Sequence, residues 1–155
     1  MQFSHKFIAL ALAILPSALA DGTIIARRGS VTKTFPTDFS GLIYSTANGG
    51  LGTGRLVTSA GFHLEDDYYY ILKDETHFNM GVTISPQAPA ANGFCPELSC
   101  ETADCTGVFP LSQQPLSFPP PGDAPPAPPL AECPEVNGFT VTFCPTGAFP
   151  PDANV

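Results

Sequence analysis

The chain has 155 residues, with 6 Lys and Arg against 14 Asp and Glu and a formal net charge of −8 at pH 7. This length suits one domain with a single hydrophobic core. The negative charge would repel phosphate backbones, so it argues against a protein that binds nucleic acid. A neutral polysaccharide or a basic protein is a better match as partner, and acidity that simply keeps a secreted protein soluble explains the charge equally well.

Residues 1–20 have the features of a secretory signal peptide. Lys6 supplies a basic start, residues 7–15 are apolar but too few to span a bilayer, and Ala18 to Ala20 form a small-x-small cleavage pattern. We therefore predict a secreted, extracellular protein with one domain over residues 21–155 and no membrane association after cleavage. The oligomeric state is not predicted.

Short β-branched and aromatic runs follow, separated by Gly- and Asn-rich turns. Outside the signal, no window has the apolar spacing of an amphipathic helix. Strands are predicted at residues 23–26, 31–35, 42–45, 55–58, 68–72, 82–85 and 139–143. This pattern predicts an all-β protein, specifically an antiparallel β-sandwich. In the last run Phe and Val alternate with Thr, so one face of that strand should be buried.

Residues 109–131 form a proline-rich segment that includes Pro119 to Pro121 and 125–129. Proline lacks the N–H that a sheet ladder needs and fixes its own φ, so we expect an extended loop. Too little chain follows for a second core. The segment is therefore predicted to be a long loop that returns to the same sandwich.

The most prominent polar cluster lies at residues 65–75. Its candidate ligand-binding residues are Glu65, Asp67, Tyr68, Tyr69, Tyr70 and Asp74. Sugar rings stack on aromatic faces and sugar hydroxyls need fixed acceptors, so acids beside tyrosines could line a binding groove. The alternative is that these acids are ordinary solvated charges at a turn and a strand end. The oxygen donors match no calcium-loop spacing, so no metal or cofactor is predicted.

Two histidines flank this cluster. The sequence places no serine or cysteine beside His63 or His77 to act as a nucleophile. Both are therefore predicted to be surface histidines.

Three segments, in order, resemble the thaumatin-like (osmotin) family of secreted β-sandwich proteins. They are FNMGVTISP at 78–86, CPELSC at 95–100, and ECP with FTVTFCP at 132–145. The resemblance covers mainly residues 68–145. The proline-rich segment stands where full-length members carry a second, cysteine-rich lobe, so this chain looks like a reduced member.

The resemblance implies a disulfide between Cys95 and Cys133. Cys100 and Cys105 then remain close enough in sequence to close a small ring. The family partner of Cys144 lies near the mature N-terminus, where this chain has no cysteine. Cys144 is therefore expected to be a free or intermolecular thiol.

The resemblance also implies a function. Thaumatin-like proteins often carry an acidic cleft associated with weak binding or hydrolysis of β-1,3-glucan. Here Tyr70 or Ile71, and the pair Thr76 and His77, stand where two of its aspartates would be. We therefore expect non-enzymatic recognition of a cell-wall polysaccharide, such as β-glucan, or of a surface protein.

Two alternatives stay open. The first is a weak endo-β-1,3-glucanase, because glycoside hydrolysis needs two opposed carboxylates and Asp67 could act with Asp74 or Glu75. The second is a secreted protein-interaction or inhibitor factor that uses the proline-rich loop as its contact surface.

Overall fold

The computed structural model describes residues 7–8, 12–13, 30–134 and 136–146. The predicted strand at 23–26 lies outside these residues, as does most of the predicted signal peptide. The elements are β1 (Phe7–Ile8), β2 (Leu12–Ala13), β3 (Lys33–Thr34), β4 (Ser40–Tyr44), β5 (Thr58–His63), β6 (Tyr68–Lys73), β7 (Val82–Pro86), β8 (Leu98–Cys100), β9 (Phe109–Pro110), the 3-10 helix η1 (Leu111–Gln113), β10 (Ala131–Glu132) and β11 (Phe139–Phe143). The predicted all-β class is confirmed. In the part of the chain that the structure describes, no helix has the length and hydrophobicity needed to cross a membrane.

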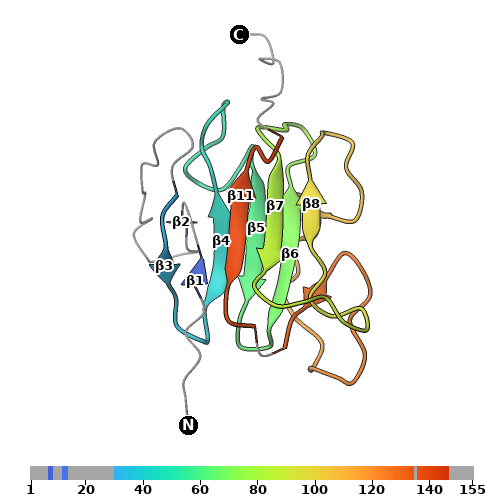
Figure 1. Cartoon of the computed structure of the whole chain (residues 1–155). Helices are drawn as coiled ribbons and strands as arrows, with labels where there is room; N and C mark the ends of the chain where they lie inside the picture. The colour runs from blue at the N-terminus through green and yellow to red at the C-terminus, as the bar shows by residue number, and fades with distance from the viewer. Residues whose placement is uncertain (1–6, 9–11, 14–29, 135, 147–155) are drawn as a thin grey trace.

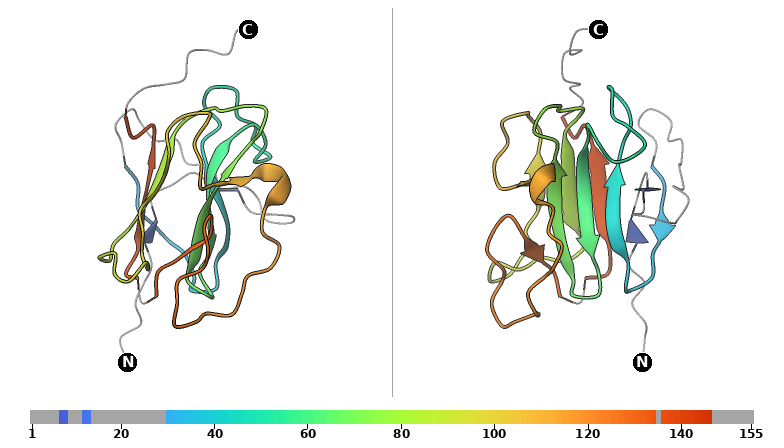
Figure 2. Two further views of the ribbon diagram at one scale, coloured as in Figure 1. Left: turned by 90° about the vertical axis from the view of Figure 1, so that its right-hand side faces the viewer. Right: turned by 180° about the vertical axis from the view of Figure 1, so that it is seen from behind.

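The strands form two main sheets that face each other (Figure 1; Figure 2, left). One has the order β10-β6-β5-β4-β2, with β9 also beside β6, and the other has the order β11-β7-β8. β1 and β3 pair separately. Among the described strands, every pairing is antiparallel except the parallel contact of β6 with β9. The last strand, β11, pairs with β7 over its full length, so the chain does return across the proline-rich segment.

The inner face of the β4–β5–β6 sheet carries the larger hydrophobic core. Side chains alternate along a strand, so every second residue points inward. Phe62 and Tyr69 are opposite each other on β5 and β6, and both rings contact Phe139 of β11 at centroid distances of 5.1 Å. The same cluster includes Ile43, Ala60, Ile71, Val82, Ile84 and Val141, which come from both sheets.

The outer face of the same sheet is covered by the proline-rich segment rather than by a third sheet (Figure 2, right). Leu42, Tyr44, Val57, Tyr70 and Leu72 form a second buried cluster there. Phe109, Phe118 and Leu130, from the start, middle and end of the segment, pack against this cluster. This predicted loop therefore acts as a cover for the outer face.

Two disulfides hold the C-terminal half together, and their pairing is the one that the resemblance implies. Cys95 joins Cys133 next to β10, and Cys100, the last residue of β8, joins Cys105. The amide of Cys95 donates to the Glu132 carbonyl and that of Cys133 to the Asp67 carbonyl, so the first disulfide is fixed to the start of β6.

Candidate functional site

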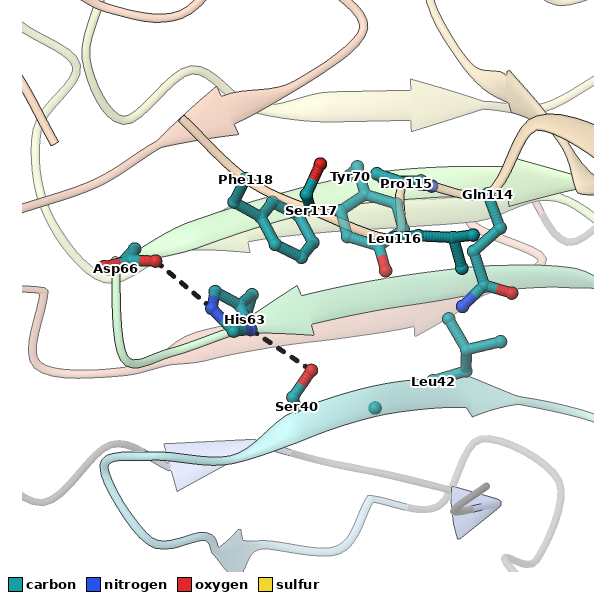
Figure 3. A pocket seen from close by; sticks show the side chains of 11 residues that line it. Ser40, Leu42, His63, Asp66, Tyr70, Gln114, Pro115, Leu116, Ser117 and Phe118 are labelled. Carbon is teal, nitrogen blue, oxygen red and sulfur yellow. Dashed lines mark hydrogen bonds and ion pairs between the residues drawn. The ribbon is translucent and has the colours of Figure 1, made fainter. Parts of the chain in front are cut away.

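A pocket of about 440 Å³ opens on the outer face, between the β4–β5–β6 sheet and the proline-rich segment (Figure 3). The sheet supplies one wall and residues 114–118 supply the other. The lining residues are Ser40, Gly41, Leu42, His63, Asp66, Tyr70, Gln114, Pro115, Leu116, Ser117 and Phe118. We call this the outer pocket.

Strand register places the polar residues of the outer pocket side by side. Ser40 of β4 is opposite His63 of β5, and His63 is opposite Tyr68 of β6. Directly opposed residues of an antiparallel pair project from the same face with Cβ atoms about 5 Å apart. Tyr68 is in turn opposite Glu132 of β10, so one row of polar side chains crosses four strands.

His63 is at the centre of a three-residue chain of contacts. Its Nδ1 lies 3.2 Å from the Ser40 hydroxyl, and its Nε2 lies 3.2 Å from the Asp66 carboxylate (Figure 3). Asp66 belongs to the β5–β6 turn, three residues after His63. A proton on Nε2 would be donated to Asp66, and this leaves Nδ1 as an acceptor for the Ser40 O–H.

Phe118 fixes the plane of the His63 ring. The two rings are stacked, with centroids 4.3 Å apart and planes 7° apart. Phe118 also contacts Tyr68 and Tyr70 at centroid distances of 5.7 and 5.9 Å. One partly buried phenylalanine of the loop therefore orders three side chains of the sheet.

Tyr70 forms the floor of the outer pocket and is 3 % exposed. Its ring lies on Gly61, the opposite residue of β5, where a Cβ would be 2.2 Å from the ring. Burial raises the pKa of Tyr70 to about 12, although a hydrogen bond from Gln114 acts in the other direction. The phenol is therefore neutral at physiological pH.

Glu132 continues the polar row beneath the surface. It is 3 % exposed, and among the described residues its Oε2 has no hydrogen-bond partner. Burial and the charges of Asp67 and Asp66 raise the pKa of its carboxyl, while a hydrogen bond from the Tyr68 hydroxyl opposes that rise. Burial raises the pKa of Tyr68, and so do the charges of Glu132 and Asp66 and the hydrogen bond to Glu132.

The structure separates the three tyrosines of the sequence-predicted cluster. Tyr69 faces inward, is fully buried, and donates its hydroxyl to the Pro96 carbonyl at 2.5 Å. Burial raises the pKa of Tyr69 well above its usual value. Tyr68 and Tyr70 face outward beneath the loop, and only Tyr70 of the three lines the outer pocket. A groove shared by Asp67 and Tyr69 is therefore not formed, because the second sheet covers that face.

The predicted acids also lie apart. Asp67 precedes β6 and Asp74 follows it, which puts their Cα atoms roughly 23 Å apart at about 3.3 Å per residue. Paired glycosidase carboxylates are about 5 to 10 Å apart. The glucanase alternative therefore lacks the opposed pair on which it depends. Glu65 is exposed at the β5–β6 turn, away from Asp74.

Asp74 and Glu75 are engaged in holding loops. Asp74 accepts from the Leu56 amide at 3.1 Å and from the Thr76 amide at 2.9 Å. Burial raises the pKa of Asp74, but these bonds and one from the Thr76 hydroxyl outweigh it, and the net shift is downward. Glu75 accepts from the hydroxyl and the amide of Ser112 in η1, and the hydroxyl bond is the main cause of its lowered pKa.

Cys144 is a free, half-buried cysteine directly after β11. Its amide donates to the Gly81 carbonyl at 2.8 Å, and burial raises the pKa of its thiol. A protonated thiol is a poor nucleophile. Among the described residues, no group of three or more His, Cys, Asp or Glu side chains could hold a metal ion.

Sequence reasoning missed the outer pocket. Ser40 and His63 are 23 positions apart and meet only through the β4–β5 register. The spacing of His63 and Asp66 across a turn was the one local signal that could have drawn attention to the site.

No family model, no curated protein and no solved structure matches this chain. The thaumatin-like resemblance therefore stays a prediction.

Proposed function

We propose that this protein is a reduced, secreted thaumatin-like β-sandwich whose outer pocket recognises a sugar unit of a cell-wall polysaccharide, such as β-glucan. The observation that carries the proposal is the composition of the outer pocket. Phe118 and Tyr70 supply aromatic surface, and Ser40, Asp66 and Gln114 supply polar atoms beside it. Sugars need both kinds of surface in one site.

Charge and cross-linking support the same proposal. A chain of net charge −8 matches a neutral polysaccharide better than an anionic one. Two disulfides suit an oxidising compartment, in line with the predicted export signal. Recognition here is binding without cleavage of a glycosidic bond, because the acids predicted for that reaction lie apart.

Leu116 offers a direct test. It lines the outer pocket and is 96 % exposed, so its removal should not disturb the fold. The matched control is Leu51, which is 45 % exposed. It lies in the loop after β4, at the opposite end of that strand from Ser40 of the outer pocket. We expect Leu116→Ala to weaken binding to insoluble β-1,3-glucan about five-fold, because about 1 kcal/mol of apolar contact is lost, and Leu51→Ala to leave binding unchanged.

The measurement is depletion of protein from solution over a range of glucan concentrations, with chitin and cellulose as matched insoluble polymers. Depletion by glucan that depends on Leu116 supports the proposal. Wild-type protein that stays in solution at micromolar concentration would reject it, and so would equal losses in the two leucine variants.

A further inference from the structure

We infer that Ser40, His63 and Asp66 form a nucleophilic centre that hydrolyses carboxylic esters with short acyl groups. The inference goes beyond sugar recognition and does not depend on it, although both use the outer pocket. Its basis is the continuous chain of contacts from the Ser40 hydroxyl through the imidazole to the Asp66 carboxylate, at 3.2 Å each. Serine is activated as a nucleophile by a hydrogen-bonded base that a third group orients.

Each member of this centre is held by a different part of the fold. Ser40 begins β4, His63 ends β5, and Asp66 lies in the following turn. Phe118 stacks on the imidazole and restricts its rotation, which makes Phe118 a positioning residue. The arrangement is therefore built from strand register, a turn and the loop cover.

Ser40 is accessible to a substrate. Its side chain is exposed at the mouth of the outer pocket, and Leu42, Pro115 and Leu116 line the adjoining wall (Figure 3). These apolar groups suit a short acyl chain. Gln114 also lines the outer pocket, and a side-chain carboxamide is a donor of the kind that stabilises an oxyanion.

The reaction balances within these groups and water. The Ser40 oxygen attacks the ester carbonyl carbon, and its proton passes to His63 Nδ1 while Asp66 holds the proton on Nε2. The C–O bond to the alcohol breaks, and the leaving alkoxide takes the proton from Nδ1. Water then attacks the acyl-serine, gives its proton to Nδ1, and releases the acid as Ser40 regains a proton from His63.

The first test is hydrolysis of p-nitrophenyl acetate by the whole protein. We expect Ser40→Ala, His63→Gln and Asp66→Asn each to lower the rate by about 100-fold or more, as for loss of the nucleophile, of the general base and of its orienting group. The matched controls are His77→Gln, whose ring contacts the Asn48 carbonyl, and Ser85→Ala, whose hydroxyl donates to Glu97. Both controls should retain the wild-type rate.

The second test is decided on the wild-type protein, and the variants only extend it. A fluorophosphonate should label wild-type Ser40 with loss of fluoride, and mass spectrometry of the peptide that contains Ser40 would locate the adduct. His63→Gln should lose this labelling while His77→Gln keeps it. A wild-type protein without an adduct on Ser40, or ester hydrolysis that is unchanged in Ser40→Ala, overturns the inference whether or not glucan is bound.

Discussion

On its inner face the β4–β5–β6 sheet meets a second sheet, whereas on its outer face the same strands meet a loop. The inward-facing residues alternate along β4, β5 and β6, and they pack against residues that alternate in the same way along the second sheet. The outer cover is a proline-rich segment that contributes Phe109, Phe118 and Leu130 at intervals. Between those contacts the cover leaves space, and the outer pocket lies there. In this protein the less regular cover is the one that leaves a pocket against the sheet.

The largest effect should come from the inner face. Phe62→Ala removes a fully buried ring that contacts Phe139, and we expect the free energy of unfolding to fall by about 3–5 kcal/mol. Phe118→Ala on the outer face should cost less than half as much, because this ring is partly exposed and its loop can relax. Urea unfolding of both variants measures the difference. Equal losses would contradict the contrast between the two faces.

A medium effect is expected where the two strands approach on the outer face. Gly61→Ala would place a Cβ 2.2 Å from the Tyr70 ring, so the ring must move, at a cost of about 1–3 kcal/mol. A Cβ at Gly52 would meet no other part of the chain within 4 Å, so Gly52→Ala is the matched control and should be near neutral. Thermal unfolding compares them. A neutral Gly61→Ala would show that Tyr70 is not held on the sheet.

The smallest effect concerns the buried Glu132 and depends on pH. Its raised pKa means that the folded state keeps a proton that the unfolded state releases, so this group lowers stability as pH rises above 4.5. Glu132→Gln removes this fall in stability with rising pH. Relative to wild type we expect the variant to gain about 1 kcal/mol between pH 4 and pH 7, the order of the cost of an unsatisfied buried group.

Chemical denaturation at several pH values measures the Glu132 slope. Glu65→Gln is the matched control, because Glu65 is exposed at the β5–β6 turn. It should follow the wild-type profile at every pH. A Glu132→Gln profile parallel to wild type would show that this carboxyl has no unfavourable burial.

The all-β class could be predicted because it depends on local sequence pattern: short β-branched and aromatic runs separated by turn residues. The runs at 68–72, 82–85 and 139–143 became β6, β7 and β11 with nearly the same bounds. The predicted strand at 55–58 was displaced, and β5 starts at Thr58. Leu56 adopts a positive φ of 58° and donates its amide to Asp74, so residues 55–57 belong to a loop.

The remaining strands and the site could not be predicted in the same way. β9 and β10 have two residues each, and both are strands only because they pair with β6. Two residues are too few to show an alternating sequence pattern. The outer pocket depends on the pairing of Ser40 with His63 and on where Phe118 lands. Both are consequences of tertiary packing. The acids at 65–75 were predicted to form a site because they are neighbours in sequence.

The bond between Cys95 and Cys133 turns the intervening backbone into a closed covalent circle, with the smaller Cys100–Cys105 circle nested inside it. The whole proline-rich cover is part of that circle. A protease that cuts the cover once would therefore open the larger circle without releasing a fragment. The two new ends would stay tethered to the sheet beneath, and the nicked molecule would differ from the intact one by a single water.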